Sequence, residues 1–169
     1  MSFLNPTDES GKREVSFAAD RMLGRLAKWL RVLGFDVIYG PHLSGYGLIR
    51  AARAEGRVIL TRDSRLKQRQ PPPFLLISSD HYREQLEQVI GEFRLDTGRK
   101  FFTRCLKCNS LLQPRPKKAV ESIVPPYVFT TQERFFWCPS CQKVYWPATH
   151  HQRMVIELRE MGMIDSGTL

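Results

Sequence analysis

Four cysteines are the residues whose spacing points most directly to a chemical role. They form two C-x-x-C pairs, Cys105 with Cys108 and Cys138 with Cys141. Two such pairs separated by a loop are typical of a tetrahedral zinc site, because the two-residue spacer lets both sulfurs of a pair reach one ion. Four thiolates leave no coordination position for water, so we expect a structural Zn²⁺.

Two other roles of cysteine fit the sequence less well. Disulfides need an oxidising compartment, and residues 1–12, MSFLNPTDESGK, are polar and carry acids, unlike a signal peptide. A redox site needs only one C-x-x-C pair. No apolar run approaches the ~20 residues of a membrane-spanning helix. We therefore expect a cytoplasmic protein with no membrane partner and a disordered tail over residues 1–13.

Three aspartates form a second candidate site. Asp20, Asp63 and Asp80 each follow an apolar run, in the segments AAD, LTRD and SSD. If these runs are parallel strands, all three aspartates emerge at the carboxyl edge of one sheet, where ligands bind in open α/β folds. Asp36 precedes its run and should emerge at the opposite edge, as a turn or capping residue. Mg²⁺ or Mn²⁺ relieves the repulsion between clustered carboxylates and activates water for phosphodiester hydrolysis.

Helix capping is an alternative role for the same aspartates. Each of the three also precedes a helical pattern, and Asp is a favoured N-cap residue. Asp63 has a third possible role as an ion-pair partner, because Arg62 and Arg65 flank it. The residues by themselves leave capping, ion pairing and metal binding open, although a basic chain with an acidic pocket suits phosphodiester hydrolysis.

The charge of the chain indicates an anionic partner. Among 169 residues, 26 are Lys or Arg and 17 are Asp or Glu, a formal net charge of +9. Residues 1–99 carry 16 basic and 12 acidic side chains, and residues 100–169 carry 10 and 5, so both parts are basic. Nucleic acid is the commonest partner of such a chain. The hydrophobic fraction of 42% excludes global disorder.

Strand and helix patterns alternate through the first hundred residues. Near-continuous apolar runs predict strands over 15–19, 36–39, 58–61 and 74–78. Apolar residues at helical spacing predict helices over 21–33, 48–55 and 82–93, the first with the stripe Met22, Leu26, Trp29, Leu30 and Leu33. This order is typical of a parallel sheet covered on both faces. Thr149 and Gln152 match a capping box, which predicts a last helix from Thr149.

Several of these segments resemble those of a known family. The stretch DRMLGRLAKWLRVLGFD, residues 20–36, together with LTRD at 60–63, the two C-x-x-C pairs and VYW at 144–146, resembles the PIN-like ribonuclease family. The branch with a C-terminal zinc ribbon, also found at the C-terminus of a mutator-type exonuclease, is the most similar. The resemblance extends from Val15 to Met161. It implies a three-layer α/β/α nuclease domain over 14–99 and a zinc ribbon with a C-terminal helix over 100–169.

The resemblance also implies a ribonuclease site, a hydrolase acting on RNA. Asp20 and Asp63 would bind catalytic Mg²⁺ or Mn²⁺, and Asp80 would assist or orient a water. One feature departs from the family pattern: the segment LSGYGLIR, residues 43–50, contains no acid, and Glu55 stands at the far end of its helix. The alternative is therefore a non-catalytic RNA- or protein-binding module with a reduced pocket.

Basic and aromatic residues supply candidate RNA contacts. The predicted phosphate contacts are Arg21, Arg25 and Lys28 on the polar face of the first helix, with Arg62 and Arg65 beside Asp63; a solvated helix face is the alternative. Seven aromatics near the cysteines either stack on unpaired bases or fill a small core: Phe101, Phe102, Phe135, Phe136, Trp137, Tyr145 and Trp146. With four thiolates present, His150 and His151 should be surface or interface residues.

Overall fold

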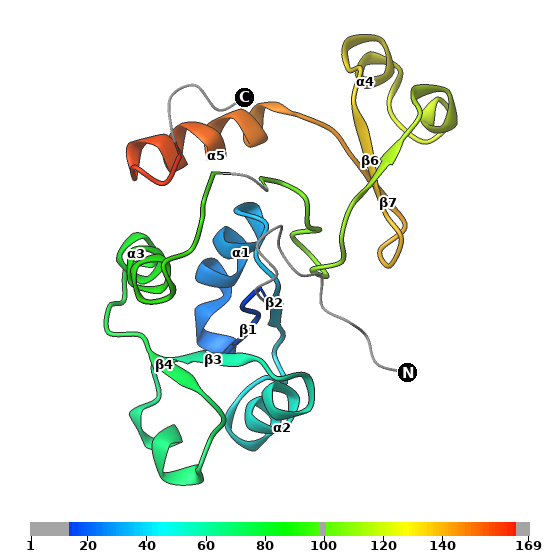
Figure 1. The fold of residues 1–169 in the computed structure, drawn as a ribbon. Helices are drawn as coiled ribbons and strands as arrows, with labels where there is room; N and C mark the ends of the chain where they lie inside the picture. The colour runs from blue at the N-terminus through cyan, green and yellow to red at the C-terminus, as the bar shows by residue number, and fades with distance from the viewer. Residues whose placement is uncertain (1–13, 99–100, 165–169) are drawn as a thin grey trace. The chain divides into compact units, whose positions relative to one another are not determined.

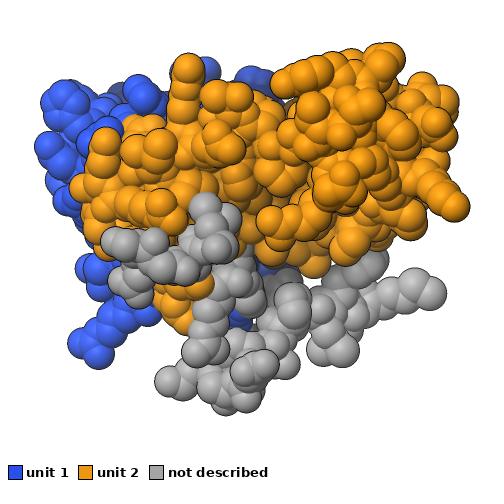
Figure 2. All heavy atoms as spheres, turned by 90° about the horizontal axis from the view of Figure 1, so that it is seen from above, with its two compact units in different colours: residues 1–30, 35–95 blue, residues 31–34, 96–169 orange. Residues whose placement is uncertain are grey.

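The computed structural model describes residues 14–98 and 101–164, and the tail expected over residues 1–13 lies outside them. The chain divides into two compact units (Figure 2). Unit 1 comprises residues 1–30 and 35–95, and unit 2 comprises residues 31–34 and 96–169. None of the helices in the described residues is long and apolar enough to cross a membrane.

Unit 1 is built on a four-stranded parallel sheet (Figure 1). Its strands are β1 (Phe17–Ala19), β2 (Val37–Tyr39), β3 (Val58–Thr61) and β4 (Phe74–Leu76), in the order β2-β1-β3-β4. Every pairing is parallel. The predicted α/β architecture with a parallel sheet is therefore confirmed, and all four strands present their carboxyl ends at one edge.

Helices and 3₁₀ turns connect the strands of unit 1, and a final helix follows β4. The helices are α1 (Gly24–Val32), α2 (Gly45–Glu55) and α3 (Tyr82–Phe93), and the 3₁₀ turns span Arg21–Leu23 and Ser64–Arg69. Helix α2 starts three residues before the predicted Leu48. It ends as predicted at Gly56, whose φ of 64° is a left-handed conformation that favours glycine.

Helices pack on both faces of this sheet. On one face, Ala18 of β1 and Ile59 of β3 share a buried cluster with α2. On the other face, Phe17 of β1 contacts Phe93 of α3 edge to face, with ring centroids 5.2 Å apart. Because successive strand residues point to opposite faces, Phe17 packs against α3 and Ala18 packs against α2.

Three apolar residues are more exposed than the sequence predicts. Met22 belongs to the predicted helical stripe, yet it is 51% exposed, because a 3₁₀ turn there shifts its direction relative to α1. Strand β4 was expected to be buried, but Phe74 and Leu76 are exposed. Since β4 is the last strand of the sheet, it has a neighbour on one side only.

Unit 2 contains a three-stranded antiparallel sheet in the order β5-β6-β7. The strands are β5 (Gln113–Arg115), β6 (Phe135–Cys138) and β7 (Lys143–Tyr145). Pro114 is compatible with β5 because it is an edge strand. The described residues of this unit also form a 3₁₀ turn over Lys117–Val120 and the helices α4 (Pro126–Thr131) and α5 (Thr149–Glu160).

The last helix starts where the sequence predicts, but by a different mechanism. Helix α5 begins at Thr149, and its N-cap is Ala148, which makes no side-chain capping bond. The backbone carbonyl of Ala148 instead accepts from the amides of His151 and Gln152, at 2.9 and 3.2 Å. The predicted capping box, with Thr149 as N-cap, is therefore wrong.

Candidate active site and metal centre

Asp20 lies at the carboxyl end of β1 with its side chain inside the protein. Its backbone N–H donates to Leu60 O at 2.9 Å, which continues the pairing of β1 with β3, and the residue is only 2% exposed. The Thr61 hydroxyl donates to Asp20 Oδ2 at 2.7 Å. Asp20 Oδ1 is buried and has no hydrogen-bond partner among the described residues. Such an orphaned acceptor is costly, and a cation is one group that would satisfy it.

Thr61 links the first two aspartate positions, and the sequence prediction missed it. This fully buried last residue of β3 donates to Asp20, and its Oγ1 accepts the backbone N–H of Asp63 at 3.0 Å. The hydroxyl thus holds the Asp20 carboxylate in one orientation and positions the turn that carries Asp63. The sequence feature that could have indicated this role is a hydroxyl residue at the end of the apolar run over residues 58–60.

Asp63 caps the turn after β3 and pairs with an arginine. Its Oδ1 accepts from the backbone N–H of Arg65 at 3.0 Å and from Arg65 Nε at 2.9 Å. These bonds from Arg65, first from its side chain and then from its backbone, hold the pKa of Asp63 below its usual value. Capping and ion pairing, two of the roles considered for Asp63, are both present.

Asp80 occupies a different environment from the other two aspartates. Its side chain is 73% exposed and forms an ion pair with Arg62. The N-cap of α3 is His81 and not Asp80, and Asp20 makes no side-chain capping bond, so side-chain capping applies to Asp63 alone among the three. In the described part of the chain, the three aspartates do not form a group close enough to share a metal ion.

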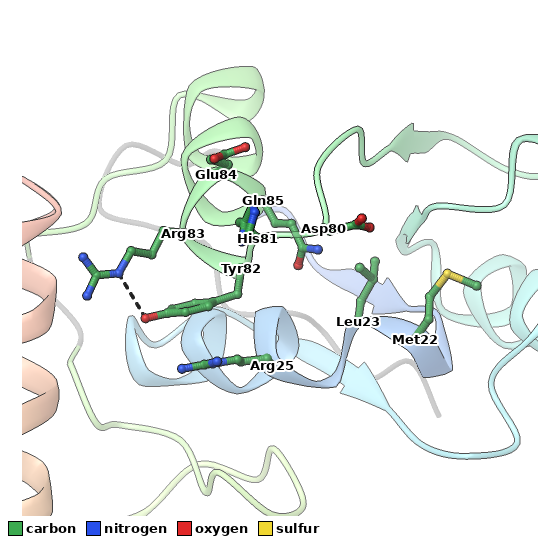
Figure 3. Close-up of a pocket in the computed structure, with 9 residues that line it drawn as sticks. All are labelled: Met22, Leu23, Arg25, Asp80, His81, Tyr82, Arg83, Glu84 and Gln85. Carbon is green, nitrogen blue, oxygen red and sulfur yellow. Dashed lines mark hydrogen bonds between the residues drawn. The ribbon is translucent and has the colours of Figure 1, made fainter.

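A hollow of about 560 Å³ lies between the turn after β1 and the start of α3 (Figure 3). Asp80 and His81 line it together with Met22 and Leu23. Arg25 lies over the Tyr82 ring at 3.8 Å. The lining therefore combines the acids Asp80 and Glu84 with the cations Arg25 and Arg83 and with aromatic and apolar side chains.

The predicted phosphate-binding residues divide into two groups. Arg21, Arg25 and Lys28 are all exposed, as predicted for the polar face of the first helix. Arg62 and Arg65 are exposed as well, but each is paired with a carboxylate, Asp80 and Asp63 respectively. In this arrangement the two arginines neutralise the carboxylates of Asp80 and Asp63.

Asp36 lies at the opposite edge of the sheet, as predicted. It precedes β2, and its carboxylate accepts from Arg57, which precedes β3. Glu55 accepts from the same guanidinium at 2.7 Å. Arg57 thus binds both acids at the amino edge, which confirms that Glu55 does not supplement the aspartates after β1 and β3.

The four cysteines converge as a zinc site requires. Their sulfur atoms all lie within 4.8 Å of one another, and Cys105 and Cys138 are buried. Each C-x-x-C pair occupies a tight turn that is followed by a left-handed residue, Asn109 (φ 73°) in one and Gln142 (φ 53°) in the other. This cluster can hold one zinc ion, and it contains no histidine, as predicted for His150 and His151.

Hydroxyl groups and neighbouring thiols surround the cysteine sulfurs and shift their pKa values in opposite directions. Burial raises the pKa of Cys108, but hydrogen bonds from Ser110 and the neighbouring thiols outweigh it and lower the pKa to about 6. Hydrogen bonding with Cys108 raises the pKa of Cys141 to about 12. The Tyr145 hydroxyl lies 3.1 Å from Cys105 Sγ. Ser110 and Tyr145 are thus outer partners of the ligands, a role that spacing alone did not reveal.

The aromatics of unit 2 are only partly a core. Phe135 is buried in a cluster with Val120 and Val124, and Trp146 packs against this cluster while staying half-buried. Five others are also half-buried: Phe101, Phe102, Phe136, Trp137 and Tyr145. His151 stacks on Phe102, with ring centroids 3.5 Å apart. Burial, followed by the charges of His150 and Arg134, lowers the pKa of His151.

Comparison with known proteins assigns the chain to a family. The family described as the Mut7-C RNAse domain matches residues 15–158, and the chain belongs to it. This confirms the resemblance to the ribonuclease domain found at the C-terminus of a mutator-type exonuclease. Neither the curated proteins nor the solved structures gave a match.

Proposed function

We propose that this chain is a divalent-metal-dependent ribonuclease that hydrolyses RNA phosphodiester bonds at the carboxyl edge of the unit 1 sheet. Membership of the Mut7-C RNAse domain family supports nuclease activity on RNA. The single observation that carries the location is the buried Oδ1 of Asp20, which has no hydrogen-bond partner within residues 14–98 and 101–164. We assign a PIN-like three-layer nuclease domain to residues 14–99 and a zinc ribbon with a C-terminal helix to residues 100–169.

In this proposal Asp20 and Asp63 are the ligands of the catalytic ion, and Asp80 orients a water. A bound Mg²⁺ or Mn²⁺ would supply an activated water and stabilise charge on the phosphoryl oxygens. Thr61 donates to Asp20 Oδ2, which leaves Oδ1 available as the ligand atom. Asp63 shares its carboxylate with Arg65, and it would hold the ion through the same oxygens.

Phosphate recognition is assigned to the cations around these carboxylates. Arg21, Arg25 and Lys28 extend along one exposed face from the turn that follows Asp20. An arginine released from Asp63 or Asp80 can bind a phosphate through its planar donor fork, so Arg62 and Arg65 serve the substrate when the ion and RNA are bound.

The four cysteines are assigned a structural Zn²⁺. Their sulfurs lie close enough to bind one ion, and their coordination leaves no position for a reacting water. The zinc therefore stabilises unit 2 and takes no part in hydrolysis.

The decisive experiment measures single-turnover cleavage of a labelled single-stranded RNA by zinc-loaded protein, with and without added Mn²⁺. We expect cleavage only with the ion. Asp20→Asn and Asp63→Asn should each lower the rate by at least about 100-fold, because each removes a ligand worth several kcal/mol of transition-state stabilisation. The matched control is Asp36→Asn at the opposite edge, which should leave the rate unchanged.

Two results would contradict this assignment. The first is full activity in Asp20→Asn, which would place the chemistry elsewhere. The second is RNA binding without cleavage across varied sequences and structures in either metal, which would indicate the non-catalytic binding module. Melting curves and zinc content of each variant establish that a lost rate reflects lost chemistry.

A further inference from the structure

Unit 2 contains a groove that includes none of the four cysteines and none of the residues of the proposed nuclease site. Its volume is about 540 Å³, which lies within the range of ligand-binding sites, ~300–1,000 Å³. Its walls come from the segment before the first cysteine pair, from β6 and from the segment that joins β7 to α5. Five aromatic residues line it: Phe101, Phe102, Phe136, Tyr145 and Trp146.

The aromatic rings of the groove remain partly exposed, whereas the adjacent residue Phe135 is buried. Phe135 and Phe136 are consecutive residues of β6, so their side chains point to opposite faces. Phe135 is 2% exposed and belongs to the core cluster, while Phe136 is half-buried and lines the groove. The groove face of β6 is thus aromatic without being part of the core.

Phe102 holds an unusual backbone conformation in the wall of this groove. Its φ of 54° is left-handed, which is rare for a bulky residue. Its N–H donates to Val32 O at 2.8 Å, and its ring stacks on His151. Strained residues of this kind cluster at ligand-binding positions.

The charge of the lining is entirely of one sign. Arg104 and Arg134 contribute cations, and no Asp or Glu is among the described lining residues. Arg104 is held by the carbonyls of Gly34 and Asn109, at 3.0 and 3.1 Å. Arg134 is exposed on the segment that leads into β6. A planar aromatic ligand that carries negative charge complements both the aromatic rings and the positive charge of this groove.

We propose that this groove binds single-stranded nucleic acid by stacking an unpaired base on its aromatic rings, with Arg134 contacting a neighbouring phosphate. Aromatic platforms next to cations are the usual means of binding unpaired strands, because every base has a π-face. The inference rests on the proposed function for the identity of the strand, since the groove would hold part of the RNA substrate.

The test measures equilibrium binding of a labelled single-stranded oligouridine to the full-length, zinc-loaded Asp20→Asn protein without added Mn²⁺. We expect Phe136→Ala to weaken binding by about 5- to 150-fold, the range for loss of one stacked base. The matched control is Tyr127→Ala, an aromatic that is 76% exposed outside the groove, and it should bind as the parent does. An abasic oligomer of equal length and charge should bind weakly to all three proteins.

A second measurement keeps the test decisive if Phe136→Ala loses zinc or unfolds. Bound oligouridine should quench the Trp146 fluorescence, and Trp146→Phe should bind with similar affinity but lose that quenching. The proposal is overturned if the abasic oligomer binds the parent as tightly as oligouridine, or if Trp146→Phe leaves the quenching unchanged. Because no cleavage is measured, base-dependent binding can be established even if the nuclease assignment fails.

Discussion

The two units of this protein stabilise their folds by different means. Unit 1 packs α2 and α3 on opposite faces of its parallel sheet and fully buries large side chains such as Leu26, Leu48 and Leu60. In unit 2, the core cluster beside β6 contains three buried residues, Val120, Val124 and Phe135. Further buried apolar residues of unit 2, Val155 and Leu158 among them, lie on α5. A zinc ion held by the four cysteines would add to the stability of this unit. Unit 1 should therefore respond most to lost apolar volume, and unit 2 to lost metal ligands.

Loss of zinc should give the largest effect, and it should be confined to unit 2. Cys138→Ser removes a buried ligand, and structural zinc sites contribute apparent free energies of about 10–16 kcal/mol in small domains. We expect loss of bound zinc and of amide-exchange protection in β5, β6 and β7, while β1 and β3 stay protected. Hydrogen exchange by mass spectrometry measures the protection of the strands in both units.

The matched control for this change is Ser140→Ala, within the same C-x-x-C turn but without a ligand atom. Ser140→Ala should retain bound zinc and the amide-exchange protection of β5, β6 and β7. Uniform loss of protection in Cys138→Ser, including β1 and β3, would contradict the independence of the two units.

Lost apolar volume in unit 1 should give the next largest effect. Leu48 in α2 is fully buried against β1 and β3, so Leu48→Ala leaves a cavity and should lower the free energy of unfolding by about 2–5 kcal/mol. Zinc content should not change. Denaturant unfolding measures the free energy of unfolding, and a chromogenic chelator measures the zinc content. Zinc loss in this variant would show that the two units unfold together.

Removal of the Thr61 hydroxyl should have a smaller effect on stability. Thr61→Val keeps the shape of the side chain but leaves Asp20 Oδ2 without its donor and Asp63 N–H without its acceptor. The expected loss is about 1–3 kcal/mol of unfolding free energy, the cost of unsatisfied buried groups. Thr61→Ser retains the hydroxyl and is the control. Equal unfolding free energies for the two variants would contradict the role of Thr61 as an organiser of the site.

The smallest expected effect is electrostatic and concerns Asp63. Hydrogen bonds from Arg65 lower its folded-state pKa, so their stabilisation is present above the unfolded pKa and is lost as pH falls through the folded pKa. Arg65→Gln should raise the pKa of Asp63 toward its ordinary value, as measured by carboxyl NMR titration. Arg62→Gln, which loses a contact with Asp80 instead, should leave the Asp63 titration unchanged.

Local patterns predicted the elements more accurately than their environments. Strand β3 occupies residues 58–61 as expected, because a short apolar run bounded by Gly56 and a polar turn has few alternatives. Met22, Phe74 and Leu76 also fit apolar patterns, yet they are exposed. Their exposure depends on a 3₁₀ turn and on the position of β4 at the sheet edge, which no local pattern encodes.

The sequence by itself predicted that the four cysteines form one cluster, that the strands of unit 1 are parallel, and that Asp20 and Asp36 lie at opposite edges of the sheet. Ligand spacing and strand direction are properties of the chain, so they can be derived without coordinates. Only the tertiary structure decided that Asp20 is buried with one oxygen unpartnered, and that Arg65 binds Asp63 while Arg62 binds Asp80. Burial and pairing depend on which side chains from distant segments meet, and packing alone decides that.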